Sequence, residues 1–555
     1  MPAKPSEIFS ETIHTYYEYN GGLECPLCFS KLRHEFNNGG RKITTLKGTL
    51  WVVTNYYSCT NSSCDLHEAF PAAYHSAMLR KRFSLDVWAK VIQHHFKHHL
   101  NYSVIAELMW DDWDVSISRG TVRSVCEYFE MAGKQYMNKK VVKDVQANQR
   151  IVLSLDGAQP VKGEPALWVF SDRITGHVLL ARNLETAPAH ILCELLKEIE
   201  RLYCVPIVSI ISDKQKNIVN AVKKFKPTIP HAFCHYHFLN HVLEPITAKD
   251  RQLKKLLRKS VRSLSIVQNS RIAELHELYG LFLPISEELK CAIAVKGNRF
   301  EILAGTEIFA NLEHVISELQ QFTSWNLTIK VKRTLTTLIA MLDKILEKNR
   351  PLYDDINVLI PYFAEIRDIL GKRNKNSLEI EGAIKIWENN LKVLLKKNNL
   401  EHDPNKIKWK QPTSKMTRGE VWQEWIRLVN AYRDGLFVAY DHEDLDFTNN
   451  AKEQLFGRSK HHFKSLLGRE NVARAFDKHG GLYTQLLDVD YSQENVTRVL
   501  LACETPLTES QRRDFFSQYA TFRREWKIRE KDTGNMSLFK EQLTNFRGRV
   551  RFFVE

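Results

Sequence analysis

The sequence predicts a mixed α+β protein that consists of several domains. At 555 residues the chain is longer than one hydrophobic core usually organises, so three or four domains are expected. Strand patterns occur in two separate stretches: residues 42–59 alternate apolar and polar side chains, and residues 150–213 contain apolar strand runs together with a helical segment. Residues 246–445 carry helical periodicity almost throughout. Apolar residues make up 43% of the chain, a share that is typical of folded proteins with packed cores.

The chain is strongly basic, with a formal net charge of +14. This excess favours a polyanionic partner, and because no apolar run is long enough to span a membrane, we expect nucleic acid rather than lipid. The first residues, MPAKPSEIFSETIH, lack the apolar core of a secretory signal, so the ten cysteines are expected to stay reduced and to bind metal. These features predict a cytoplasmic, nucleoid-associated protein in a bacterium or a nuclear protein in a eukaryote.

Two cysteine pairs near the start predict a zinc ribbon over residues 1–78. The pairs flank the alternating stretch 42–59, which reads as a β-hairpin, and they consist of Cys25, Cys28, Cys59 and Cys64. Four thiolates in two such pairs make a closed tetrahedral site for one structural zinc ion. The second pair is spaced more widely than the first, and His67 is close enough in sequence to replace Cys64 as the fourth ligand.

Residues 79–145 predict a helix-turn-helix DNA-binding domain. Three helical segments, each beginning with Ser or Asn in an N-cap position, cover residues 84–100, 101–110 and 116–136. The third segment would be the recognition helix. Its start carries the side chains expected to reach DNA, namely Arg119, Thr121 and Arg123. The alternative is a plain three-helix packing module whose charges are solvated.

Residues 146–245 predict the first part of an α/β core. Their segments follow the order strand, strand, strand, helix, strand, helix, strand, which is the order of a ribonuclease H-like fold. The first strand ends at Asp156 and the fourth ends at Asp213. Because these two strands are neighbours in that fold, both acids are expected at the same edge of the sheet.

Two neighbouring carboxylates repel each other in a low dielectric unless a cation lies between them. Magnesium is the natural cation because it takes hard oxygen ligands, and two magnesium or manganese ions can support the displacement at a phosphodiester. The alternative is that Asp156 and Asp213 each cap the end of a strand or the helix that follows it.

A third carboxylate is expected from the segment 446–478, which follows the all-helical insertion 246–445. Glu453 lies near the start of a predicted helix in this segment. The later turns of that helix carry basic residues suited to a phosphate backbone, namely Arg458, Lys460 and Lys464. The alternative for Glu453 is a charge in the first turn that the helix dipole stabilises. The remaining residues, 479–555, are expected to form a helical, basic C-terminal region.

Three motifs resemble the catalytic core of DDE transposases of the Mutator superfamily, including their bacterial insertion-sequence relatives. The motifs are SLDGA, ISDKQKNIVNAVKKFKPTIPHAFCHYHFLNHV and TNNAKEQLFGRSK. The resemblance covers residues 150–475 and implies that three acids hold two magnesium or manganese ions, namely Asp156, Asp213 and Glu453. It departs from the family at Lys214, where glycine is common in relatives. The context of the glutamate is looser than that of the aspartates, so Glu443 is the rival for its role.

The same resemblance makes Cys234 and His237 a signature pair that follows the fifth strand. His237 is expected near the metal site, where it would hydrogen-bond the scissile phosphate or orient the helix of the glutamate, and Cys234 is expected to be a small packed side chain. Zinc binding by this pair and cysteine-protease chemistry are the less favoured alternatives. His235 and His241 are taken as ordinary polar residues.

The resemblance implies a transposase that cleaves phosphodiesters at transposon ends and then transfers the freed strand into target DNA. Its partners would be double-stranded DNA, at the terminal inverted repeats and the target, and at least one further copy of the chain to bridge two ends. Two alternatives remain open. One is a domesticated transposase that acts as a non-catalytic DNA-binding regulator, and the other is an RNase H-like nuclease that cuts without joining.

Overall fold

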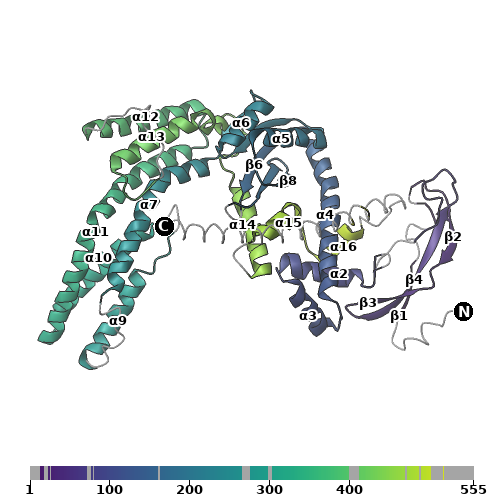
Figure 1. The fold of residues 1–555 in the computed structure, drawn as a ribbon, viewed down its shortest axis with the longest axis horizontal. Coiled ribbons are helices and arrows are strands. Elements are labelled where there is room, and N and C mark those ends of the chain that lie inside the picture. The colour runs from purple at the N-terminus through teal and green to yellow at the C-terminus, as the bar shows by residue number, and fades with distance from the viewer. Residues whose placement is uncertain are drawn as a thin grey trace, which may run out of the picture. The chain divides into compact units, whose positions relative to one another are not determined.

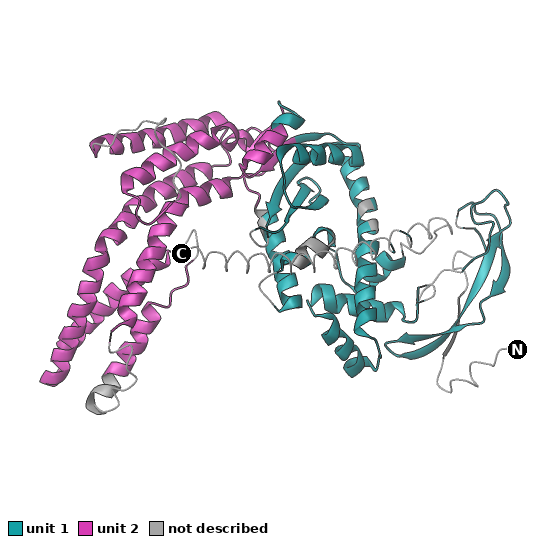
Figure 2. Cartoon of the chain, in the orientation of Figure 1, with its two compact units in different colours: residues 1–208, 223–227, 450–555 teal, residues 209–222, 228–449 magenta. Residues whose placement is uncertain are grey.

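The fold is a mixed α+β arrangement that divides into two compact units. The computed structural model describes residues 13–17, 23–25, 27–71, 77–78, 81–159, 163–264, 276–297, 303–398, 412–468, 472–486, 489–501, 517 and 520. The first unit comprises 1–208, 223–227 and 450–555, and the second comprises 209–222 and 228–449 (Figure 2).

A small sheet in the first unit is organised around one long strand. Its strands are β1 (Ile13–Tyr17), β2 (Leu32–Asn37), β3 (Arg41–Thr45), β4 (Gly48–Cys59) and β5 (Phe70–Pro71), and each of the others pairs with β4 (Figure 1). β3 and β4 form the predicted hairpin, in which Thr45 lies opposite Gly48. β4 contributes Val52 and Tyr57 to a small separate core that also contains cysteine side chains. A core of this size has little apolar surface with which to hold the sheet.

A set of helices follows the small sheet. They are α2 (Leu85–Ile92), the π-helical turn η1 (Gln93–Lys97), α3 (Tyr102–Trp113) and α4 (Arg119–Asn148). The expected cap at Asn101 is confirmed, because its side chain accepts hydrogen bonds from the first turn of α3. Ser84 precedes α2 without a side-chain cap bond, and α4 is capped by Ser118 instead of the expected Ser116. α4 continues to Asn148 and so runs through the domain boundary expected at residue 145. It continues because this stretch contains neither Gly nor Pro and buries Val141 and Val145.

The second sheet follows α4. Its elements are β6 (Ile151–Ala158), β7 (Ala166–Asp172), β8 (Val178–Leu184), α5 (Ala189–Tyr203), β9 (Ile207–Ser212), α6 (Lys216–Phe225) and β10 (His231–Phe233). This is the element order that the sequence predicts. The strand order is β10-β9-β6-β7-β8, with β6, β7 and β8 antiparallel and β9 and β10 parallel. β6 and β7 are buried over most of their lengths, as continuous apolar runs require.

Three late helices of the first unit share a core with the early helices. They are α14 (Asn450–Leu467), α15 (Ala473–Leu486) and α16 (Gln493–Leu501). A single hydrophobic cluster contains Phe129 of α4, Val169 of β7, Phe463 of α14 and Leu486 of α15. Residues 79–145 therefore do not close a core of their own, and their removal from the chain would expose the shared cluster to water.

The second unit is helical except for its short strand segments. Its helices are α7 (His235–Arg262), α9 (His276–Ala292), α10 (Ala304–Thr323), α11 (Ile329–Leu370), α12 (Ser377–Lys397), α13 (Arg418–Leu436) and the 3-10 turn η3 (Val438–Tyr440). They pack around one core in which Trp387 and Trp425 are fully buried. The described residues of the stretch 246–445 form helices joined by short connections, and the first of these helices begins at His235. Among the described residues, no helix is long and apolar enough to cross a membrane.

Candidate metal centre and carboxylate site

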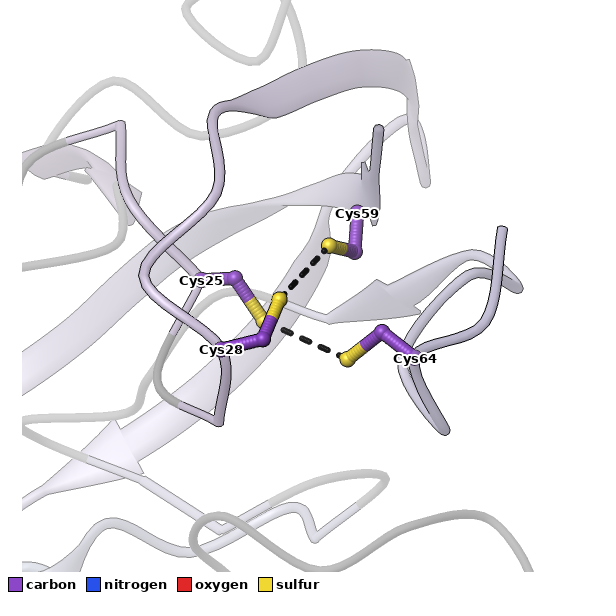
Figure 3. A group of neighbouring side chains, drawn as sticks. All are labelled: Cys25, Cys28, Cys59 and Cys64. Carbon is purple, nitrogen blue, oxygen red and sulfur yellow. Dashed lines mark hydrogen bonds between the residues drawn. The ribbon is translucent and has the colours of Figure 1, made fainter. Parts of the chain in front are cut away.

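Four cysteine thiols meet at one end of the small sheet. The sulfur atoms of Cys25, Cys28, Cys59 and Cys64 all lie within 4.8 Å of one another (Figure 3). The Sγ atoms of Cys25 and Cys64 are 3.7 Å apart, and those of Cys28 and Cys59 are 3.4 Å apart. A disulfide needs about 2.05 Å, whereas tetrahedral zinc with Zn–S bonds of about 2.3 Å places its sulfurs ~3.8 Å apart. The cluster can therefore hold a zinc ion.

Local turns bring the cysteines of each pair together. In the first pair, the N–H of Cys25 donates to the carbonyl of Ser30 at 2.7 Å, and the N–H of Phe29 donates to the carbonyl of Cys25 at 2.9 Å. Phe29 has a left-handed backbone, with φ of 60°, which closes this turn. In the second pair, the N–H of Asn61 donates to the sulfur of Cys59 at 3.4 Å. Backbone N–H groups directed at sulfur stabilise thiolates.

The fourth member of the cluster is Cys64 and not His67. The thiol of Cys64 belongs to the cluster and is buried, with 8% of the residue exposed. His67 instead places its Nδ1 atom 2.8 Å from the carbonyl oxygen of Cys64, where it supports the turn. The alternative that the sequence left open is thereby decided by the backbone that follows the second pair.

The thiols of the cluster differ in acidity. Hydrogen bonds from Ser30 lower the pKa of Cys28 to about 6. Burial raises the pKa of Cys59 to about 12. A bound divalent cation would supply the charge that converts a buried thiol such as Cys59 into a thiolate ligand. The donor set fits zinc because all four ligands are soft sulfur atoms.

In the first unit, the predicted catalytic Asp156 lies on β6. It is 5% exposed, and its Oδ1 accepts a hydrogen bond of 2.8 Å from the N–H of Gly157. Its partner across the β6–β7 ladder is Val169. The carboxyl group therefore belongs to a buried rung of the sheet.

Lys452, in the first turn of α14, reaches the same rung. Its ammonium donates to the carbonyl of Val169 at 3.2 Å and to the hydroxyl of Ser171, and only 2% of the residue is exposed. Burial lowers the pKa of Lys452 to about 7, and the charge of Asp156 opposes this change. The first turn of α14 is thus fixed beside Asp156 by a lysine for which the sequence carries no signal.

The predicted third acid, Glu453, is the next residue in the same turn of α14. Its side chain lies outside the described residues. The rival, Glu443, is exposed in the turn-rich segment 441–449. Along α14, Arg458 and Lys460 are exposed and Lys464 is half-buried.

In the second unit, the predicted catalytic Asp213 directly follows β9 and is 8% exposed. Burial raises its pKa, and the nearby imidazoles of His237 and His241 oppose this change. Lys214, the residue that departs from the family motif, places its ammonium 5.1 Å from the centre of the Tyr432 ring. Asp156 and Asp213 belong to different units.

The signature pair follows the fifth strand, β10, and His237 lies in the helix that comes next. β10 ends at Phe233, Cys234 is the N-cap of α7, and His237 is in its first turn. The helix begins here because the buried positions Cys234, Phe238 and Val242 recur every four residues.

Cys234 is a packed side chain, as expected. It is fully buried, and its sulfur accepts a hydrogen bond of 3.1 Å from the N–H of Asn449. The expectation that His235 is an ordinary polar residue is wrong. Its Nε2 lies 2.8 Å from the carbonyl of Leu436, its N–H donates to the carbonyl of Phe447, and burial lowers its pKa to about 4. In the described part of the chain, the only group of three or more potential metal ligands is the cysteine cluster, which leaves Cys234 and His237 outside it.

The residues expected to read DNA lie in the first turns of α4. Arg119 is exposed, and Thr121 is half-buried beside its cap, Ser118. Arg123 forms an ion pair of 2.7 Å with Glu127, one turn later on the same helix. Arg119 is therefore the arginine that is better placed to meet a phosphate or a base.

Histidines that the sequence did not single out form a buried cluster between α14 and the early helices. The Nδ1 atoms of His99 and His462 are 2.7 Å apart, and the ring of His462 stacks on that of Tyr483, with centroids 4.0 Å apart. His95 contacts His462 edge to face. Burial lowers the pKa of His95 to about 4 and that of His462 to about 2. These rings are neutral in the folded chain at neutral pH.

Acidification is expected to destabilise the first unit. His95 and His462 have folded pKa values below the unfolded value of 6.5, so the unfolded chain binds protons that the fold excludes. Their contribution is complete above pH 6.5 and is lost as the pH falls, by about 1.4 kcal/mol per histidine for each pH unit. Denaturant unfolding at pH 7 and pH 5 measures the loss. His462→Gln should flatten the dependence, whereas His461→Gln, at the exposed neighbouring position, should leave it unchanged; equal slopes in both variants would contradict this origin.

Comparison of the chain with known protein families finds no match, and comparison with curated proteins also finds none.

Proposed function

We propose that this protein is a DNA transposase with an RNase H-like core, which cuts DNA at the ends of a mobile element and joins them to target DNA. One support is the second sheet, whose strand order β10-β9-β6-β7-β8 combines an antiparallel β6–β7–β8 meander with a parallel β9–β10 pair. A second is that the motifs resembling DDE transposases fall on β6, on the β9-to-α7 stretch and at the start of α14.

The observation that carries this proposal is the contact between Lys452 and the Asp156 rung. A lysine that is 98% buried beside a buried aspartate is an unusual arrangement, because each charge would be unfavourable alone. The contact joins α14 to β7 at Val169, the residue opposite Asp156. Glu453 is the next residue along α14, which supports its assignment to a carboxylate site with Asp156. 

The proposed roles follow from the chemistry of the donor set. Asp156, Asp213 and Glu453 would hold two divalent ions, magnesium or manganese, which would supply Lewis-acid stabilisation of the charge on the phosphate oxygens. His237, beside Asp213, would donate a hydrogen bond to the scissile phosphate. Water would attack a phosphodiester at the element's end, so that the 3′-oxygen of the element leaves as a 3′-hydroxyl and the flanking strand keeps the 5′-phosphate. That 3′-hydroxyl would then attack a target phosphodiester in the same site, and the target's own 3′-oxygen would leave as a hydroxyl.

DNA recognition is assigned to the early part of the first unit and to α14. The zinc ribbon and helices α2 to α4 would bind the terminal inverted repeats, with Arg119, Thr121 and Arg123 at the start of α4. The basic turns of α14 would follow the backbone through Arg458, Lys460 and Lys464. Two ends must be joined in one event, so the active form is proposed as a homodimer or a higher homo-oligomer, located with the DNA in the nucleoid or the nucleus.

The test is cleavage by the full-length protein. Purified protein is mixed with labelled duplexes that carry the inverted repeats flanking its gene. Magnesium or manganese should give nicks with 3′-hydroxyl ends and joined products, and calcium should give little of either, because its larger, looser coordination suits the displacement poorly. Binding without cleavage under all metals would favour a regulator, and cleavage without joining would favour a nuclease.

Removal of the Lys452 ammonium is expected to slow cleavage while leaving DNA binding intact. In Lys452→Met, the carbonyl of Val169 and the hydroxyl of Ser171 lose their buried donor, and the first turn of α14 is released from the Asp156 rung. Small misplacements of catalytic groups lower rates by about 100-fold. Single-turnover cleavage at saturating magnesium measures this effect.

The control for this variant is Gln454→Met, which places the same side chain at an exposed position of the same helix. It should cleave at the wild-type rate. An unchanged rate in Lys452→Met, with the variant still folded by circular dichroism, would show that α14 is held in place by other contacts.

A further inference from the structure

A cavity of about 770 Å³ lies in the first unit between the early helices and α14. The first turns of α3 and α4 form one side of it, and the last turns of α14 together with α15 form the other. Its volume falls in the range of about 300–1,000 Å³ that is typical of small-molecule sites. Arg119 and Arg123, which line it, are proposed DNA contacts, but the roles proposed above assign no ligand to the cavity itself.

One end of the cavity is positively charged. Arg119 and Arg123 both line it, and the starts of α3 and α4 add their partial positive charges. Arg123 is already paired with Glu127, whereas within the described part of the chain Arg119 has no ion-pair partner. The Arg119 guanidinium therefore offers paired donors of the kind that bind a phosphate.

The opposite wall is apolar and aromatic. Phe463, Leu466 and Leu467 present it from α14, and Ala475 adds a small side chain from α15. Glu130, which is 4% exposed, also lines the cavity and pairs with His479 at 3.1 Å. These features suit an occupant that combines an anionic group with a flat apolar body.

We propose that this cavity binds a single nucleotide unit, with its phosphate at Arg119 and its base against the Phe463 wall. A nucleobase supplies the flat face and, in adenine, cytosine and guanine, the amino group that a carboxylate such as Glu130 can accept from. A simple anion would leave the apolar wall unused, and a purely apolar ligand would make no use of Arg119. The nucleotide comes either from an unpaired position of bound DNA or from solution, and the first source rests on the proposed function.

The cavity is tested by the fluorescence of 2-aminopurine, which changes when the base leaves water and stacks. Two probes are titrated into the full-length protein without added magnesium: 2-aminopurine deoxyriboside monophosphate, and an end duplex with one unpaired 2-aminopurine nucleotide. A fully paired duplex is the reference. Saturable signal from either probe is expected; a signal from the duplex alone identifies DNA as the source, and a signal from the monophosphate shows that free nucleotide also binds.

Three variants locate the signal. Ala475→Trp fills the cavity, and Arg119→Gln removes its charge; each should weaken binding at least about tenfold. Lys140→Gln makes the same change of charge at an exposed position of α4 outside the cavity and should bind as the wild type does. If Ala475→Trp does not fold, Leu467→Trp replaces it, because that side chain is 42% exposed.

The absence of a saturable signal from both probes, or equal affinity in the folded cavity-filling variant, would overturn the assignment. Because the titrations need no magnesium and no cleavage, this outcome is separate from a failure of the proposed transposase activity. Cleavage without a nucleotide signal would support the proposed function and contradict nucleotide binding in the cavity. A nucleotide signal without cleavage would support nucleotide binding alone.

Discussion

Asp156→Asn, Asp213→Asn and Glu453→Gln are each expected to abolish DNA cleavage and strand transfer. Each change removes a negatively charged oxygen ligand from a site that is proposed to hold two cations, and a loss of at least about 1,000-fold in rate is expected from the removal of transition-state electrostatics. End-labelled duplexes and single-turnover conditions measure the rate. Binding of the same duplexes, measured by mobility shift without magnesium, should be retained, because the carboxylates make no required contact to bases.

Asp213→Asn and Asp156→Asn are expected to change the stability of the fold in opposite directions. Burial raises the pKa of Asp213 in the folded chain above its unfolded value of 3.8. The folded chain therefore gives up this proton less readily than the unfolded chain does. Its stabilising contribution is lost as the pH rises, and Asp213→Asn should melt at the same temperature as the wild type or higher at pH 7. Asp156→Asn should melt lower, because it leaves the buried Lys452 without the opposing charge that supports its protonation.

The matched control for Glu453→Gln is Glu443→Gln, which makes the same change at an exposed position. The control should cleave at the wild-type rate. If cleavage persists in Glu453→Gln and disappears in Glu443→Gln, the third acid has been assigned to the wrong residue although the core remains. If cleavage persists in all three catalytic variants, the DDE chemistry itself is excluded.

Features with local sequence signals could be predicted. The zinc cluster follows from four cysteines in two pairs, because a turn and a hairpin are enough to bring them together. The element order of the second sheet follows from the alternation of apolar runs with helical segments. The cap Asn101 follows from its side chain, which satisfies the first N–H groups of a helix.

Features that depend on distant contacts could not be predicted. The contact of His99 with His462 joins positions 363 residues apart, and Lys452 reaches a strand 283 residues away. No periodicity reports such a pairing, because both residue types are usually solvated on helices. The start of α7 lies earlier than the sequence predicts for a related reason. The three residues of β10 are too few to show where a strand pattern ends and a helical pattern begins.

Loss of the cysteine cluster is expected to unfold the small sheet while the rest of the first unit stays folded. Wild-type protein should contain about one zinc per chain, and Cys25→Ser, Cys28→Ser should contain none, since a zinc ion does not stay bound to two remaining thiolates. Structural zinc contributes about 10–16 kcal/mol in small metal-dependent folds. Metal analysis measures the zinc, and hydrogen exchange of the β2, β3 and β4 peptides measures the fold.

The expected loss is local because the two cores of this unit are separate. The sheet's own cluster contains only a few apolar side chains, including Ile43 and Val52, and the cysteines themselves are part of it. The cluster around Phe129 and Leu486 contains none of the four ligands, so slow exchange in α4 and α15 should survive. Cys204→Ser changes an exposed cysteine outside the cluster and should keep both zinc and protection. Full zinc in the double variant would instead place the metal on other residues, and fast exchange throughout α4 would show that the helices depend on the ribbon for their fold.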